Sequence, residues 1–178
     1  MRYKDIRRYL KPYSMVASRA TTINHAFAAC IAPCDKYDEE VMRKAIIALG
    51  QDPDSDLLCV YCGDEAETWD HIHATVREKK FSGHGHRIGN LLPCCKTCNS
   101  KKGNKNWRTF LTARGDSPAS DERLSRIEAY LSSYCTPDAV PEHLAEYMEL
   151  QELRSQVLEI FQRADALAKI VRSKSSAA

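Results

Sequence analysis

No stretch of this 178-residue sequence is apolar for long enough to cross a lipid bilayer, which takes about 20 consecutive apolar residues. The first thirty residues also lack an apolar run followed by a cleavage signal, the pattern of an exported chain. With 43% hydrophobic and 28% charged residues, the composition is that of an ordinary globular protein. The sequence therefore predicts a cytoplasmic protein without a signal peptide or a membrane partner.

The missing export signal changes the meaning of the eight cysteines. In a secreted chain they would suggest disulfides, whereas in a reducing compartment closely spaced cysteines are more often metal ligands. Two C-x2-C pairs are present, Cys59 with Cys62 and Cys95 with Cys98, and each short turn aims two sulfurs at one point. Together they predict a structural Zn²⁺ site with four thiolate ligands. The long loop between the pairs costs little beside the roughly 10–16 kcal/mol of structural zinc binding.

Polar residues of a different kind lie inside and directly after this loop. Asp70 and His71 are adjacent in the segment Trp-Asp-His-Ile-His, Asn90 precedes two leucines, and Asn99 follows the second cysteine pair. On a twisted strand, an adjacent Asp and His can hold a metal ion and handle a proton nearby. Carboxylate and amide oxygens suit Mg²⁺ or Mn²⁺ rather than zinc. The residues thus predict that zinc holds the scaffold while a second ion takes part in chemistry.

The order C-x2-C, D-H, N-L, C-x2-C-N, K-G resembles the HNH endonucleases, whose active site is a ββα-metal (His-Me finger) module. The resemblance covers about a quarter of the chain. It implies that Asp70 and Asn99 bind the catalytic divalent ion and that His71 is the general base that activates water. It also implies that Asn90 holds the histidine-bearing strand in place. The reaction implied is metal-dependent hydrolysis of DNA phosphodiester bonds.

Each of these residues also has a simpler interpretation. Asp70 and Asn99 could be a turn acid and a helix-capping amide, and a lone histidine is usually an ordinary surface or core residue. Their joint occurrence, in this order between two zinc-binding pairs, favours the catalytic interpretation. For His73 two alternatives stay open, because it either lines the site and touches phosphate or faces away from Asp70 on a short strand.

Charge is distributed unevenly, although the net charge is only +2. Residues 71–115 carry ten basic residues against one acid, whereas residues 1–70 and 116–178 are both net acidic. A basic face beside an active site attracts a polyanion, although many charge runs are only solvated surface. We therefore predict DNA as the partner. The residues predicted to contact it are His73, His86, Arg87, Lys101, Lys102 and Lys105.

The predicted fold is α+β, a small zinc-stapled ββα-metal (treble-clef-like) module embedded in a mainly helical chain. Hydrophobic spacing predicts helices over 21–32, 38–49 and 121–134, together with a terminal helix over 142–172. The predicted division is a helical region 1–58, the HNH module 59–115 and a helical region 116–178, all packed as one compact domain. A heptad pattern in the terminal helix predicts a homodimer. Its positions are Leu150, Leu153, Val157, Ile160, Ala164, Leu167 and Val171.

The function predicted from these features is that of a DNA endonuclease, of the restriction type or from a phage or mobile element. The same cysteines and basic face would also serve a non-catalytic zinc-dependent DNA-binding module. That alternative does not explain why Asp70, His71, Asn90 and Asn99 fall at the positions of the family. A third alternative is a structural adaptor that binds a protein through its terminal helix.

Overall fold

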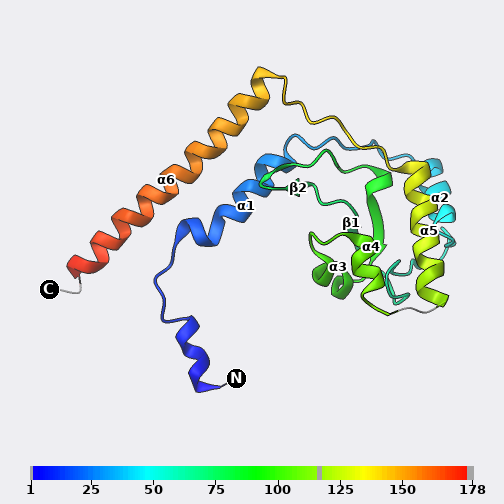
Figure 1. Cartoon of the computed structure of the whole chain (residues 1–178), viewed down its shortest axis with the longest axis horizontal. Coiled ribbons are helices and arrows are strands. Elements are labelled where there is room, and N and C mark those ends of the chain that lie inside the picture. The colour runs from blue at the N-terminus through cyan, green and yellow to red at the C-terminus, as the bar shows by residue number, and fades with distance from the viewer. Residues whose placement is uncertain (1, 116–117, 176–178) are drawn as a thin grey trace. The chain divides into compact units, whose positions relative to one another are not determined.

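The computed structural model describes residues 2–115 and 118–175. Within them the chain forms two compact units, one of residues 28–140 and one of residues 1–27 together with 141–178. The division predicted at residues 58 and 115 stays a prediction. In chain order the elements are η1 Tyr3–Arg8, α1 Met15–Ala29, α2 Glu39–Ala48, β1 Thr68–His71, β2 Val76–Arg77, β3 Lys80–Phe81, η2 Ile88–Asn90, β4 Leu91–Cys94, α3 Lys96–Lys102, α4 Trp107–Thr112, α5 Pro118–Tyr134 and α6 Ala145–Ser175 (Figure 1).

Short antiparallel strands combined with helices confirm the predicted α+β class. Strand β1 pairs with β4 in a register that sets Asp70 opposite Leu92 and His71 opposite Leu91. Strands β2 and β3 form a separate small hairpin. Helix α3 follows β4 after a single residue, Cys95, and packs against β1, so the chain forms the strand–strand–helix arrangement that the resemblance implied.

Helices α2 and α5 lie side by side and both pack against η2 (Figure 1). Helix α2 begins where predicted, and the Asp38 side chain caps it by accepting a hydrogen bond from the Val41 N–H. Gly50 follows the end of the helix with a φ of +72°. From α5, the buried Tyr130 donates a hydrogen bond to the carbonyl of Ile88 in η2. A Cβ atom on Gly89 would lie 2.0 Å from the Tyr134 carbonyl oxygen, so only glycine permits this approach.

The other unit is built from α1 and α6, and α1 begins six residues before the predicted Thr21. Its first turn is capped by Asp165 of α6, whose carboxylate accepts hydrogen bonds from the N–H groups of Met15 and Val16. The cap lies about 150 residues away in sequence, so local spacing could not reveal it. Helix α6 begins at Ala145 and ends at Ser175, three residues later at each end than predicted. None of the described helices is long and apolar enough to cross a membrane.

Candidate metal centre and active site

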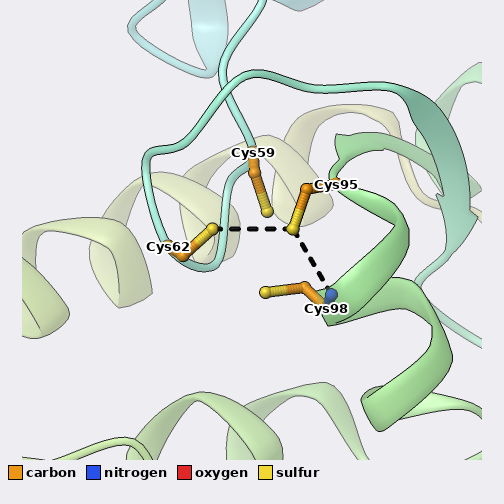
Figure 2. Close-up of side chains that lie close together, drawn as sticks. All are labelled: Cys59, Cys62, Cys95 and Cys98. Atoms are coloured by element: carbon orange, nitrogen blue, oxygen red, sulfur yellow. Dashed lines mark hydrogen bonds between the residues drawn. The ribbon is translucent and has the colours of Figure 1, made fainter.

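Four cysteine sulfurs converge beside the first turn of α3. Cys59 and Cys62 come from the loop before β1, Cys95 is the N-cap residue of α3, and Cys98 lies in the first turn of that helix (Figure 2). All four Sγ atoms lie within 4.8 Å of one another, and the Cys62–Cys95 separation is 3.7 Å. A zinc ion with Zn–S bonds of 2.3 Å at tetrahedral angles separates its sulfurs by about 3.8 Å. The cluster therefore fits a four-thiolate zinc site, as predicted.

Two neighbours complete the surroundings of this cluster. Arg114 donates a hydrogen bond to Cys98 Sγ at 3.4 Å, which offsets part of the negative charge that four thiolates would bring. Cys94 is fully buried, with its sulfur 3.9 Å from Cys59 Sγ, but it donates to the Cys95 carbonyl and lies outside the four-sulfur group. The ligand set predicted from the C-x2-C spacing is therefore the set that the fold brings together.

Asp70 is buried in β1 and paired with a lysine. It is 3% exposed, and its carboxylate lies 3.0 Å from the Nζ of Lys102, which is 1% exposed. Tyr61 donates a second hydrogen bond to the same carboxylate at 2.7 Å. Burial raises the pKa of the Asp70 carboxyl, while Lys102 and Tyr61 act in the opposite direction. The carboxylate thus already holds one cation, the Lys102 ammonium.

His71, the next residue, is half-buried and lies against a second histidine. Its Nε2 is 2.8 Å from His86 Nδ1, and the two rings meet edge to face. Burial lowers the pKa of His71, and His86 and Lys102 lower it further. The imidazole is therefore predominantly neutral near neutral pH, which is the protonation state that a general base requires.

The loop that carries His86 is held on both sides. The His86 N–H donates to the Pro33 carbonyl, and the His86 carbonyl accepts from the Asp35 N–H, so residues 33–35 run beside it. A Cβ on Gly85 would lie 2.2 Å from the Pro33 oxygen, which requires glycine there. The arrangement fixes the His86 ring next to His71.

Asn90 is buried in η2 and clamps the chain just after His71. Its Oδ1 accepts from the His73 N–H, while its Nδ2 donates to the carbonyls of His73 and Gly85. One amide therefore joins the end of the β1 segment to the loop that carries His86. This geometry is consistent with the strand-holding role implied by the resemblance.

Asn99 lies in the first half of α3, half-buried, three residues before Lys102. Residues three apart share a face of a helix, and Lys102 reaches Asp70 in β1 from that face. Asn99 is therefore on the side of α3 that packs against β1. Carboxylate and amide oxygens suit Mg²⁺ or Mn²⁺, although a divalent ion at Asp70 would compete with Lys102 for the carboxylate.

The six residues predicted to contact DNA have different surroundings. Lys101 and Lys105 are exposed, His86 faces His71, and the His73 ring stacks on His84 with centroids 4.3 Å apart. Lys102 and Arg87 both already pair with acids. Lys102 is buried against Asp70, and the Arg87 guanidinium lies between Asp35 and Asp138. A phosphate contact by Lys102 would require its buried pair with Asp70 to break, and both DNA contacts stay predictions.

Sequence reasoning did not single out the partners Tyr61, Asp35 and Asp138. Tyr61 had a local signal, since it stands between the cysteines of the first pair and next to a predicted ligand. Asp35 and Asp138 had none, because they lie 52 and 51 residues from Arg87 in sequence.

Residues 59–105 match the family model described as HNH endonuclease. No curated protein and no solved structure matches the chain. The matched segment begins at Cys59 and contains both cysteine pairs, Asp70, His71, Asn90 and Asn99. It supports a nuclease-type function in general. Over residues 59–105, the chain is therefore similar to the HNH endonuclease family, and this segment contains a cysteine cluster that fits zinc.

Proposed function

We propose that the protein is a DNA endonuclease that hydrolyses phosphodiester bonds with the residues around His71. The observation that carries the proposal is that the family match falls on the segments that the fold brings together. Strand β1 supplies Asp70 and His71, and α3, which packs against β1, supplies Asn99. A zinc-dependent DNA-binding module without catalysis would need the cysteine cluster but not this convergence.

In the proposed reaction, His71 accepts a proton from the attacking water as general base. His86 lies against its Nε2 and holds the ring, while Asn90 fixes the chain that follows. Asp70 and Asn99 would hold a Mg²⁺ or Mn²⁺ ion, which when bound would stabilise the negative charge that develops on the phosphoryl and leaving oxygens. The cysteine-bound zinc would be structural, because sulfur fills all four of its positions.

Asn99→Ala tests the proposed ligand more cleanly than Asp70→Ala, which would also leave Lys102 buried without its partner. The matched control is Ser100→Ala, an exposed neighbour on the same helix. With Mg²⁺ and plasmid DNA, Asn99→Ala should lose cleavage while it keeps DNA binding and thermal stability, and Ser100→Ala should cleave normally. Equal cleavage by both variants would remove Asn99 from the site.

The predicted homodimer stays part of this proposal, since one such site cuts one strand and a two-fold pair of sites would cut both. What motivates it is that four of the heptad residues of α6 are exposed, Leu153 at 46%, Ile160 at 59%, Leu167 at 64% and Val171 at 63%. Light scattering of the wild type and of Ile160→Glu tests it. If the wild type is a monomer, the dimer is refuted and the heptad residues pack within one chain.

A further inference from the structure

A cavity of about 230 Å³ is lined by Ile72 and His73, the two residues that follow His71 in the chain. The residues that line it also include Arg77 in β2 and His84 in the loop after β3. Lys105 and Trp107, which follow α3 in the chain, complete the lining. Cavities that enclose whole small molecules are larger, roughly 300–1,000 Å³. The space therefore suits one group of a larger ligand.

Two stacked histidines form one wall of this cavity. The His73 and His84 rings lie at 24° to each other with centroids 4.3 Å apart. Burial, with a contribution from His84, lowers the pKa of His73 to about 4, and burial also lowers the pKa of His84. Both rings are neutral at physiological pH, so each has one N–H to donate. The wall thus offers hydrogen-bond donors without excess charge.

Two cations and one acid supply the charge of the cavity. Arg77 and Lys105 line it together with Glu78, which leaves a net positive charge. Among the described residues Arg77 forms no salt bridge, in contrast to Arg87 and Arg108, whose guanidinium groups are paired with acids. Lys105 donates one hydrogen bond to the Lys101 carbonyl and retains two further N–H donors. The cavity therefore has more donors than its own residues use.

The backbone that presents Arg77 is held in an unfavourable conformation. Glu78 and Lys79 form the two-residue turn between β2 and β3 with φ values of +51° and +66°. Such turns are normally built from Asn and Gly, because other side chains disfavour positive φ. Strained backbone of this kind persists where the surrounding structure enforces it and is concentrated at functional sites. Here the two-residue turn reverses the chain direction directly after Arg77 and keeps Arg77 at the cavity wall.

We propose that this cavity is a phosphate subsite, which binds a backbone phosphate of the DNA strand next to the bond that is cut, through Arg77, Lys105 and the paired imidazoles of His73 and His84. This inference rests on the proposed nuclease function. Successive phosphates of one strand are about 3.4 Å apart along the duplex axis, so a strand with its scissile phosphate at His71 continues past the cavity. A phosphate takes hydrogen-bond donors and positive charge, and the wall offers unused donors with a net positive charge.

The test is DNA binding by the full-length, zinc-loaded protein without added Mg²⁺ or Mn²⁺, so that cleavage does not intervene. Fluorescence anisotropy with a labelled mixed-sequence duplex, repeated at several salt concentrations, compares Arg77→Ala with Lys80→Ala. Lys80 is the residue paired with Arg77 across the hairpin, is exposed, and does not line the cavity, so it controls for the loss of one charge. Arg77→Ala should weaken binding about tenfold and reduce the salt slope by about 0.9. Lys80→Ala should weaken it by about twofold or less, as for a screened surface charge.

A second readout follows the imidazole nitrogens by NMR. Addition of the duplex should shift the ring signals of His73 and His84 in the wild type and in Lys80→Ala, but not in Arg77→Ala. The subsite would be overturned if both variants lost the same binding affinity, or if the histidine ring signals did not shift on saturation with DNA. If the wild type cleaves DNA but both variants lose the same binding affinity, the nuclease proposal stands and the subsite fails. If binding depends on Arg77 but the protein does not cleave DNA in Mg²⁺, the nuclease proposal fails and the subsite stands.

Discussion

Replacement of Lys102 by methionine should destabilise the 28–140 unit severely. The Lys102 ammonium lies 3.1 Å and 3.0 Å from the two oxygens of Asp70 and 2.9 Å from the His71 carbonyl oxygen. The side chains of Lys102 and Asp70 are only 1% and 4% exposed, so water cannot replace the lost partner. Methionine has a similar length and fills the space, which limits the change to the missing charge.

Removal of one partner from a buried ion pair typically costs about 3–5 kcal/mol, because the other charge stays buried and unpaired. Lys101→Met is the matched control, since Lys101 is the exposed neighbour on α3 and its replacement should change the free energy of unfolding by about 0.5 kcal/mol or less. Guanidinium unfolding of the zinc-loaded protein, followed by tryptophan fluorescence, measures both, because Trp69 and Trp107 lie in this unit.

The double variant Asp70→Asn with Lys102→Met removes both charges, so it should unfold less readily than the sum of the two single changes predicts. Mg²⁺ adds a second check. If Asp70 binds the ion, Mg²⁺ should restore part of the stability lost in Lys102→Met but not in the double variant. Equal stability of Lys102→Met and Lys101→Met would show that the pair is not buried in solution, and the reasoning about Asp70 would fail.

Three further predictions concern the scaffold. Cys95→Ser should abolish zinc binding and unfold the module. Cys94→Ser should retain stoichiometric zinc by elemental analysis, and its free energy of unfolding should fall by only about 1–3 kcal/mol, because Cys94 is buried but is not a ligand. Equal loss of zinc in the two variants would mean that the ligand set is wrong. Glu78→Asn combined with Lys79→Gly should stabilise the hairpin by about 1–2 kcal/mol in thermal unfolding, because it relieves positive φ at two positions, and a loss of stability would refute the turn. Hydrogen bonds from the Met15 N–H and its neighbours hold the pKa of Asp165 below its usual value. The stability from Asp165 is therefore present above pH 4 and lost as the pH falls through the lowered pKa, and Asp165→Ala should remove this acid dependence from the circular dichroism of α1 and α6.

The parts of the site that depend on short spacing were predictable from sequence. A C-x2-C turn fixes the direction of two sulfurs locally, and the two pairs then need only one common ion, so the cluster of Cys59, Cys62, Cys95 and Cys98 followed from spacing alone. Such features depend on residues a few positions apart, where the backbone leaves few choices.

Pairings between distant segments could not be predicted. Lys102 belonged to a basic run and looked like a phosphate contact, but it lies buried against Asp70, 32 residues earlier in sequence. Arg87 likewise pairs with acids 52 and 51 residues away. A basic residue in a sequence carries no mark of whether it meets solvent, a phosphate or a buried carboxylate, because that depends on which segments the fold brings beside it.

The central claim, that His71 is the base of a DNA-cleaving site, is tested most directly by plasmid nicking in Mg²⁺. The variants to compare are His71→Ala and His25→Ala, the second being an exposed histidine in α1 of the other unit. Both should bind zinc and unfold at the wild-type temperature. The account predicts that wild type and His25→Ala convert supercoiled DNA to the open circle while His71→Ala does so at least about a hundredfold more slowly. Cleavage by His71→Ala at the wild-type rate would contradict it, as would a folded, zinc-loaded wild type that binds DNA and never cuts it.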